Sequence, residues 1–130
     1  MNVLHSLARP MLAGMFVYGG IDAVQHPETK VPKASKVAPP IADAAGVEAS
    51  TSELVRFNGA LQIAGGVALA AGVFPRLAAL ALGASLIPTT AAGHRFWEEK
   101  EPAARSQQTI HFLKNAAMLG GLLMVVSDGK

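Results

Sequence analysis

Hydrophobic residues gather into four long stretches of this chain, with shorter polar segments between them. The most apolar part runs from Phe57 to His94 and contains one charged residue, Arg76. It divides at Phe74-Pro75-Arg76 into two halves. A bilayer core of about 30 Å needs about 20 helical residues to cross it, and each half comes close to that length. The pattern therefore predicts two consecutive membrane-spanning helices.

Similar stretches precede and follow this part, so we expect an all-α fold: a transmembrane four-helix bundle with antiparallel neighbours, forming one domain over residues 1–130. Backbone groups find no water inside a bilayer, so apolar runs of this length are helical. Ser50-x-x-Glu53 has the form of a capping box, and Pro102 suits a first helical turn. Frequent glycine and alanine allow close helix packing. The expected spans cover residues 4–24, 52–74, 77–93 and 105–127.

The two halves of the chain show a weak internal similarity. The distance from Phe57 to the pair Gly65-Gly66 equals the distance from Phe112 to the pair Gly120-Gly121. This pattern indicates either a parallel two-helix repeat about an axis normal to the membrane or a chance match between glycine-rich and alanine-rich helices.

The composition also points to a membrane protein. Charged residues make up 15% of the chain, against roughly 25% in ordinary soluble domains, and the mean hydropathy is +0.34. A small soluble chain needs more charge to cover its surface. The net charge of +2 is spread over short loops, so no nucleic-acid surface is expected. The absence of cysteine excludes disulfides, cysteine-ligated iron–sulfur clusters and a thiol nucleophile.

Basic residues indicate the orientation of the chain. The two longer loops cover residues 25–51 and 94–104, and eight basic residues lie in or beside them: Lys30, Lys33, Lys36, Arg56, Arg95, Lys100, Arg105 and Lys114. The opposite side holds three, namely Arg9, Arg76 and Lys130. The positive-inside rule then predicts cytoplasmic loops and both termini outside, in a multi-pass protein of the inner (plasma) membrane. The first stretch lacks a basic start and a small-residue cleavage site, so we interpret it as a span and not as a signal peptide.

Polar residues within the expected spans concentrate at the end that these loops occupy. On each helix they recur at spacings of three or four residues, which places them on one face. Charges at bilayer depth are costly and usually face the interior of a bundle. We therefore expect one polar cup at the cytoplasmic end, formed by Asp22, His26, Asn58, Gln62, Thr90, His94, His111, Lys114 and Asn115.

The same residues have alternative structural roles. Asp22 can pair with Lys114 or His111, and the amide side chains can serve as interhelical hydrogen bonds. The histidines together could hold a metal or haem, but no H-x-x-x-H spacing is present, so no metal site is expected. Phe96 and Trp97 are expected to form an interfacial aromatic anchor, with stacking on a quinone ring as the alternative.

Several motifs resemble the actinobacterial type of the DoxX family. The matching segments touch all four expected spans: Arg9-Pro10-x-Leu12-Ala13, Gly20-x-Asp22-Ala23, Arg56-x-Asn58-Gly59-Ala60-x-Gln62, Pro75-Arg76-x-Ala78-Ala79, Pro88-Thr89-Thr90-x-Ala92-Gly93-His94-x-Phe96-Trp97-Glu98 and His111-Phe112-x-Lys114-Asn115. The last two are the most specific. The resemblance implies a small four-helix inner-membrane protein. The family is named after a membrane thiosulfate:quinone oxidoreductase, its relatives are associated with sulfur and oxidant stress, and it implies no set of catalytic residues here.

These observations lead to two functional hypotheses. In the first, the chain is a membrane subunit or anchor whose loops recruit soluble or membrane redox proteins for oxidant and sulfur stress. In the second, the polar cup binds a quinone or another small substrate as part of an oxidoreductase linked to thiosulfate or quinone. Asp22 and His111 would then move protons, while Lys114 and Asn115 hold an oxygen. Whether the chain is itself an enzyme stays open. Membrane lipid is an expected partner, and the small-residue faces permit a homo-oligomer.

Overall fold

The computed structural model describes residues 3–128, which form helices and no strand. This confirms the predicted all-α class. Four helices are long: α1 (Val3–Gln25), α4 (Thr51–Ala71), α5 (Pro75–Gly93) and α6 (Pro102–Ser127). Four short ones lie between them: η1 (Pro27–Thr29), α2 (Val31–Ala34), α3 (Ala38–Ala45) and η2 (Phe96–Glu98). Residues 25–51, expected to be a loop, therefore contain helical turns. Lys130, used in the orientation argument, lies outside the described residues.

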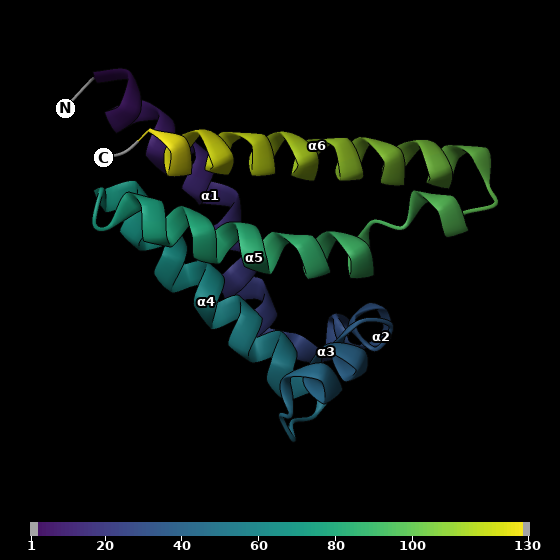
Figure 1. The fold of residues 1–130 in the computed structure, drawn as a ribbon. Coiled ribbons are helices and arrows are strands. Elements are labelled where there is room, and N and C mark those ends of the chain that lie inside the picture. The colour runs from purple at the N-terminus through teal and green to yellow at the C-terminus, as the bar shows by residue number, and fades with distance from the viewer. Residues whose placement is uncertain (1–2, 129–130) are drawn as a thin grey trace.

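The long helices pack in an open series. α1 packs along α4, α4 contacts α5, and α5 contacts α6, whereas α1 and α6 barely touch. Figure 1 shows α5 and α6 side by side and antiparallel, with α4 running at an angle to them. Both ends of the described chain lie near the turn between α4 and α5, and the short helices lie at the other end (Figure 1). The neighbours are antiparallel, as predicted. All four helices contribute to one hydrophobic core, with residues such as Phe16, Leu69, Leu82 and Leu122, and α4 and α6 diverge from there toward the other end (Figure 1).

Three helical segments are long and apolar enough to cross a membrane: Thr51–Ala71, Pro75–Glu98 and Pro102–Ser127. α1 has 23 residues, but it is not among these three segments, because Arg9, Asp22 and its glycines lower its hydropathy. A fourth crossing by α1 therefore stays a prediction. Large apolar side chains such as Met11, Phe57 and Met124 point outward, as expected for helix faces that contact lipid.

Glycines set the close approach of α1 and α4. A Cβ atom on Gly20 would lie 2.6 Å from the backbone oxygen of Gly59, and one on Gly59 would lie 2.8 Å from the oxygen of Gly20. One on Gly66 would lie 2.7 Å from a methyl group of Val17. Contacts this short leave no space for a side chain. The two helices thus use the small-residue packing that is common inside membranes.

The helix ends follow local signals. Glu53 N donates to Ser50 Oγ (3.1 Å) and Ser50 N donates to Glu53 Oε1 (3.2 Å), so the predicted capping box is confirmed. α4 ends at Ala71, three residues earlier than expected, because Gly72 adopts a left-handed conformation (φ 76°) that stops the helix. α5 then begins at Pro75. Beside this turn lies the hydrophobic core, centred on the fully buried Leu69, Leu82 and Leu122.

Candidate functional site

A polar network links α4 to α5 near the middle of both helices. Asn58 Nδ2 donates to Thr89 Oγ1 (3.0 Å), Ser85 Oγ donates to Asn58 Oδ1 (2.6 Å), and Gln62 Nε2 donates to Ser85 Oγ (2.9 Å). Gln62 is 7% exposed and Ser85 is 3% exposed. The two amides of the expected cup therefore face α5 and bond to its hydroxyl groups. These contacts agree with the alternative interpretation, in which the amide side chains form interhelical hydrogen bonds.

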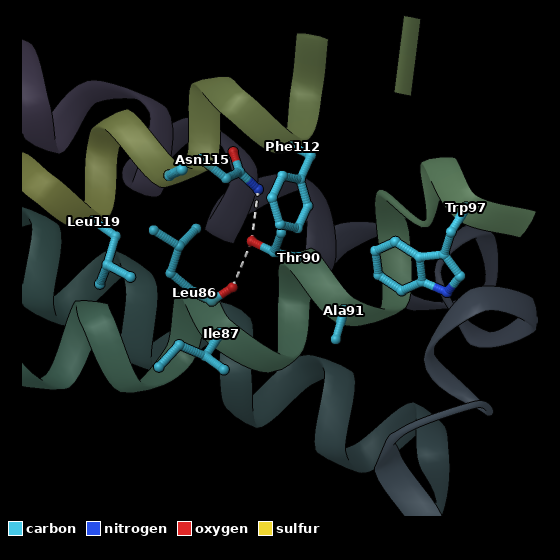
Figure 2. Close-up of a pocket in the computed structure, with 9 residues that line it drawn as sticks. Leu86, Ile87, Thr90, Ala91, Trp97, Phe112, Asn115 and Leu119 are labelled. Carbon is cyan, nitrogen blue, oxygen red and sulfur yellow. Dashed lines mark hydrogen bonds between the residues drawn. The ribbon is translucent and has the colours of Figure 1, made fainter. Parts of the chain in front are cut away.

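A second polar contact joins α5 to α6. Asn115 Nδ2 donates to Thr90 Oγ1 (2.9 Å), and Thr90 Oγ1 donates to the carbonyl oxygen of Leu86 (2.7 Å). Asn115 is 4% exposed. Figure 2 shows this chain of hydrogen bonds between the two helices. Thr90 and Asn115, both expected in the cup, thus contact each other.

Two histidines lie one helical turn further toward the end of the α5–α6 pair. The rings of His94 and His111 are stacked, with centroids 5.1 Å apart and planes inclined by 25°. His94 Nδ1 lies 2.9 Å from Gln108 Oε1, within hydrogen-bond distance. Lys114 follows His111 by one turn on α6 and is half-buried. Three cup residues, His94, His111 and Lys114, are therefore neighbours.

Aromatic rings lie beside the histidines. Phe96 contacts Trp97 and Phe112 edge to face, each with centroids 5.2 Å apart, and Trp97 lies 6.2 Å from Phe112. The guanidinium of Arg95 lies 5.8 Å from the centre of the Trp97 ring. Phe96 and Trp97, which we expected to form an interfacial aromatic anchor, pack η2 against α6. Trp97 itself remains 48% exposed.

A pocket of about 270 Å³ opens between α5 and α6. Thr90 and Asn115 form its polar part, and the remaining lining is apolar: Leu86, Ile87, Ala91, Trp97, Phe112, Ala116 and Leu119. Figure 2 shows the Trp97 ring at one end of this pocket and Leu119, Leu86 and Ile87 toward the other. No direct signal for this pocket is present in the sequence, since its lining residues have the same spacing as residues that pack in a core.

Asp22 and His26 lie apart from these groups. Asp22 forms an ion pair with Lys30 and not with Lys114 or His111, the two partners of its alternative structural role. His26 lies 3.6 Å from Glu28, and both side chains are largely exposed. Among the described residues, no group of three or more His, Asp or Glu side chains is placed to hold a metal ion. The nine residues of the expected cup thus divide into the α4–α5 network, the α5–α6 groups and an exposed pair beside η1.

Ion pairs connect the two segments that join the long helices at this end. Lys36 Nζ, just after α2, lies 2.7 Å from Glu98 Oε1 on η2, and Glu98 Oε2 accepts from Arg95 Nη1 (2.8 Å). Lys33 Nζ donates to the carbonyl oxygen of Gly93 at the end of α5 (3.4 Å). We call the surface formed by residues 27–50 and 94–101 the loop layer. Sequence reasoning missed these pairings, because they depend on how the turns of α2 and η2 meet.

The apolar helices, the outward apolar side chains and the internal polar contacts define a small all-α membrane protein. The model of the DoxX family matches residues 4–95, most of the chain. The chain therefore belongs to the DoxX family, as its motifs predicted. α6, with His111, Lys114 and Asn115, lies beyond the matched residues. No curated protein and no solved structure matches the chain.

Proposed function

We propose that this protein is the membrane subunit of a redox complex that handles oxidant and sulfur stress. It anchors a soluble oxidoreductase at the loop layer, on the cytoplasmic face of the inner membrane. The observation that carries this proposal is the joining of the two loop segments into one surface by the ion pair between Lys36 and Glu98. Two independent loops would offer a partner two mobile segments, whereas the joined layer offers one ordered surface.

The hydrogen bonding of the internal polar residues supports this role. Asn58, Gln62, Ser85 and Thr89 direct their polar groups toward one another. Among residues 3–128, no buried polar side-chain atom lacks a hydrogen-bond partner. Polar side chains that form hydrogen bonds with one another between helices stabilise helix packing. The chain also contains no cysteine, so thiol chemistry in such a complex would come from the partner.

Site-specific photo-cross-linking in native membranes tests the anchor role. A photoreactive amino acid replaces Lys100 or Pro39, which are exposed in the loop layer, and Val73, exposed at the opposite end, is the matched control. We expect adducts with a soluble oxidoreductase from the first two positions and none from the third. Adducts with lipid alone from all three positions, or the same adducts from Val73, would contradict the anchor role.

A second candidate function is binding of a quinone for an oxidoreductase component. The pocket between α5 and α6 favours it, since aromatic rings and the Thr90–Asn115 pair could hold a ring and its oxygen. Asp22 pairs with Lys30 and has no place in this site, so proton transfer would depend on His111. Solvent extraction of the protein purified in mild detergent provides the test. Quinone at one molecule per chain, lost in Asn115→Leu, would support the candidate, and quinone-free protein would refute it.

A further inference from the structure

The basic residues at the loop-layer end differ in whether a carboxylate neutralises them. Lys30 pairs with Asp22, and both Lys36 and Arg95 pair with Glu98. Lys33 instead donates to a backbone oxygen, that of Gly93. Lys114 has no ion pair or hydrogen bond with any residue from 3 to 128. Lys33 and Lys114 therefore keep a positive charge that no described carboxylate compensates, as do Arg56, Lys100 and Arg105, and of these five cations only Lys114 is half-buried.

Lys33 and Lys114 both lie close to the stacked pair of His94 and His111. The oxygen that Lys33 contacts belongs to Gly93, the residue before His94. Lys114 lies one turn beyond His111, the ring that stacks on His94. Lys114 is half-buried, and a charge at membrane depth is costly in free energy unless a group of opposite charge accompanies it. The cluster of Lys33, His94, His111 and Lys114 thus lacks its counterion.

An apolar groove begins one helical turn from this cluster. Thr90 lies one turn before His94 on α5, and Asn115 one turn after His111 on α6, and both line the pocket of about 270 Å³. From Ala91 back to Leu86 the groove follows α5 for about 8 Å, at a rise of about 1.5 Å per residue. The exposed side chains of Ile87 and Trp97 leave one side of the groove open to the surroundings. The cations near one end of the groove and its apolar lining together fit a ligand with an anionic head group and an apolar tail.

We infer that the α5–α6 pair binds one anionic phospholipid, with its phosphate against Lys33 and Lys114 and one acyl chain in the groove. A free inorganic anion would use the cations and leave the groove empty. A neutral lipid would fill the groove and leave the cations unpaired. Only an anionic lipid matches both features, and basic pockets between membrane helices are known places for such head groups. This lipid site is independent of the proposed anchor role.

Trp97 lines the groove and is the only tryptophan in the chain, so it reports occupancy directly. The full chain in detergent is titrated with phosphatidylglycerol carrying brominated acyl chains, which quench tryptophan on contact, and with phosphatidylcholine carrying the same chains. We expect tighter binding of phosphatidylglycerol. Lys33→Gln and Lys114→Gln should each weaken it about fivefold, which corresponds to the interaction of one lysine with an anionic lipid. Binding of phosphatidylcholine should not change.

Two controls separate the head group from the tail. Lys100→Gln removes an exposed cation outside the cluster and should leave binding unchanged. Ala116→Phe fills the groove and should abolish quenching by both lipids, while circular dichroism confirms that the variant keeps its helices. Equal affinity for the two lipids, or no loss in either lysine variant, would overturn the inference. Displacement of the lipid by millimolar inorganic phosphate, or by a quinone with no dependence on Lys114, would also overturn it.

Discussion

The hydroxyl of Ser85 is the centre of the α4–α5 network, and its removal gives the sharpest test of helix packing. Ser85→Ala deletes the donor to Asn58 (2.6 Å) and the acceptor from Gln62 (2.9 Å) at a position that is 3% exposed. Interhelical hydrogen bonds in membrane proteins contribute about 0.6 kcal/mol each on average. An unsatisfied buried amide adds about 1 kcal/mol or more. We therefore expect Ser85→Ala to lower the free energy of unfolding by about 2 kcal/mol.

Unfolding of the purified protein in mixed detergent micelles, with rising sodium dodecyl sulfate, measures this loss. Ser106→Ala changes an exposed serine on α6 and is the matched control, expected within about 0.5 kcal/mol of the wild type. A double-mutant cycle with Gln62→Leu should give a coupling energy of at least about 0.5 kcal/mol, because the two residues share a hydrogen bond. Additive effects, or a Ser85→Ala variant as stable as the control, would refute the network.

Three further predictions concern packing and the loop layer. Gly59→Leu should separate α1 from α4 and lower stability strongly, because its Cβ would lie 2.8 Å from a backbone oxygen, whereas Gly14→Leu, in open space, should be tolerated in the same detergent assay. Lys36→Glu should speed hydrogen exchange in α2, and adding Glu98→Lys should slow it again by restoring the ion pair with its charges exchanged. Leu69→Ala should cost about 2 kcal/mol or more in unfolding free energy, since the side chain is fully buried.

The helices themselves could be predicted closely from the sequence. The apolar runs placed α1 and α5 within two residues of their observed ends, and the Ser50 capping box fixed the start of α4. These signals are local, since hydrophobicity and capping act within one helix. The open packing was not predictable in this way. Whether α1 and α6 meet depends on the crossing angles of all four helices, which no local pattern encodes.

The candidate site was predictable only in part, for a related reason. Asn58, Gln62, Thr90 and Asn115 were found because amides and hydroxyls are conspicuous in apolar helices. Ser85, which bonds to two of these groups, was missed because serine counts as a small residue among alanines. Arg9, which the sequence analysis counted only as a basic residue of the outer side, is 7% exposed and lies within the fold. Its position depends on tertiary packing that spacing along one helix does not reveal.

In the proposed function, the loop layer at one end of these membrane helices holds a soluble redox partner. Native mass spectrometry of complexes released from native membranes in mild detergent tests it most directly. We predict a species that contains this chain and a soluble oxidoreductase at a fixed ratio, and whose abundance falls when Glu98→Lys breaks the ion pair with Lys36. Detection of this chain with lipid alone, in the wild type and the variant alike, would contradict the claim.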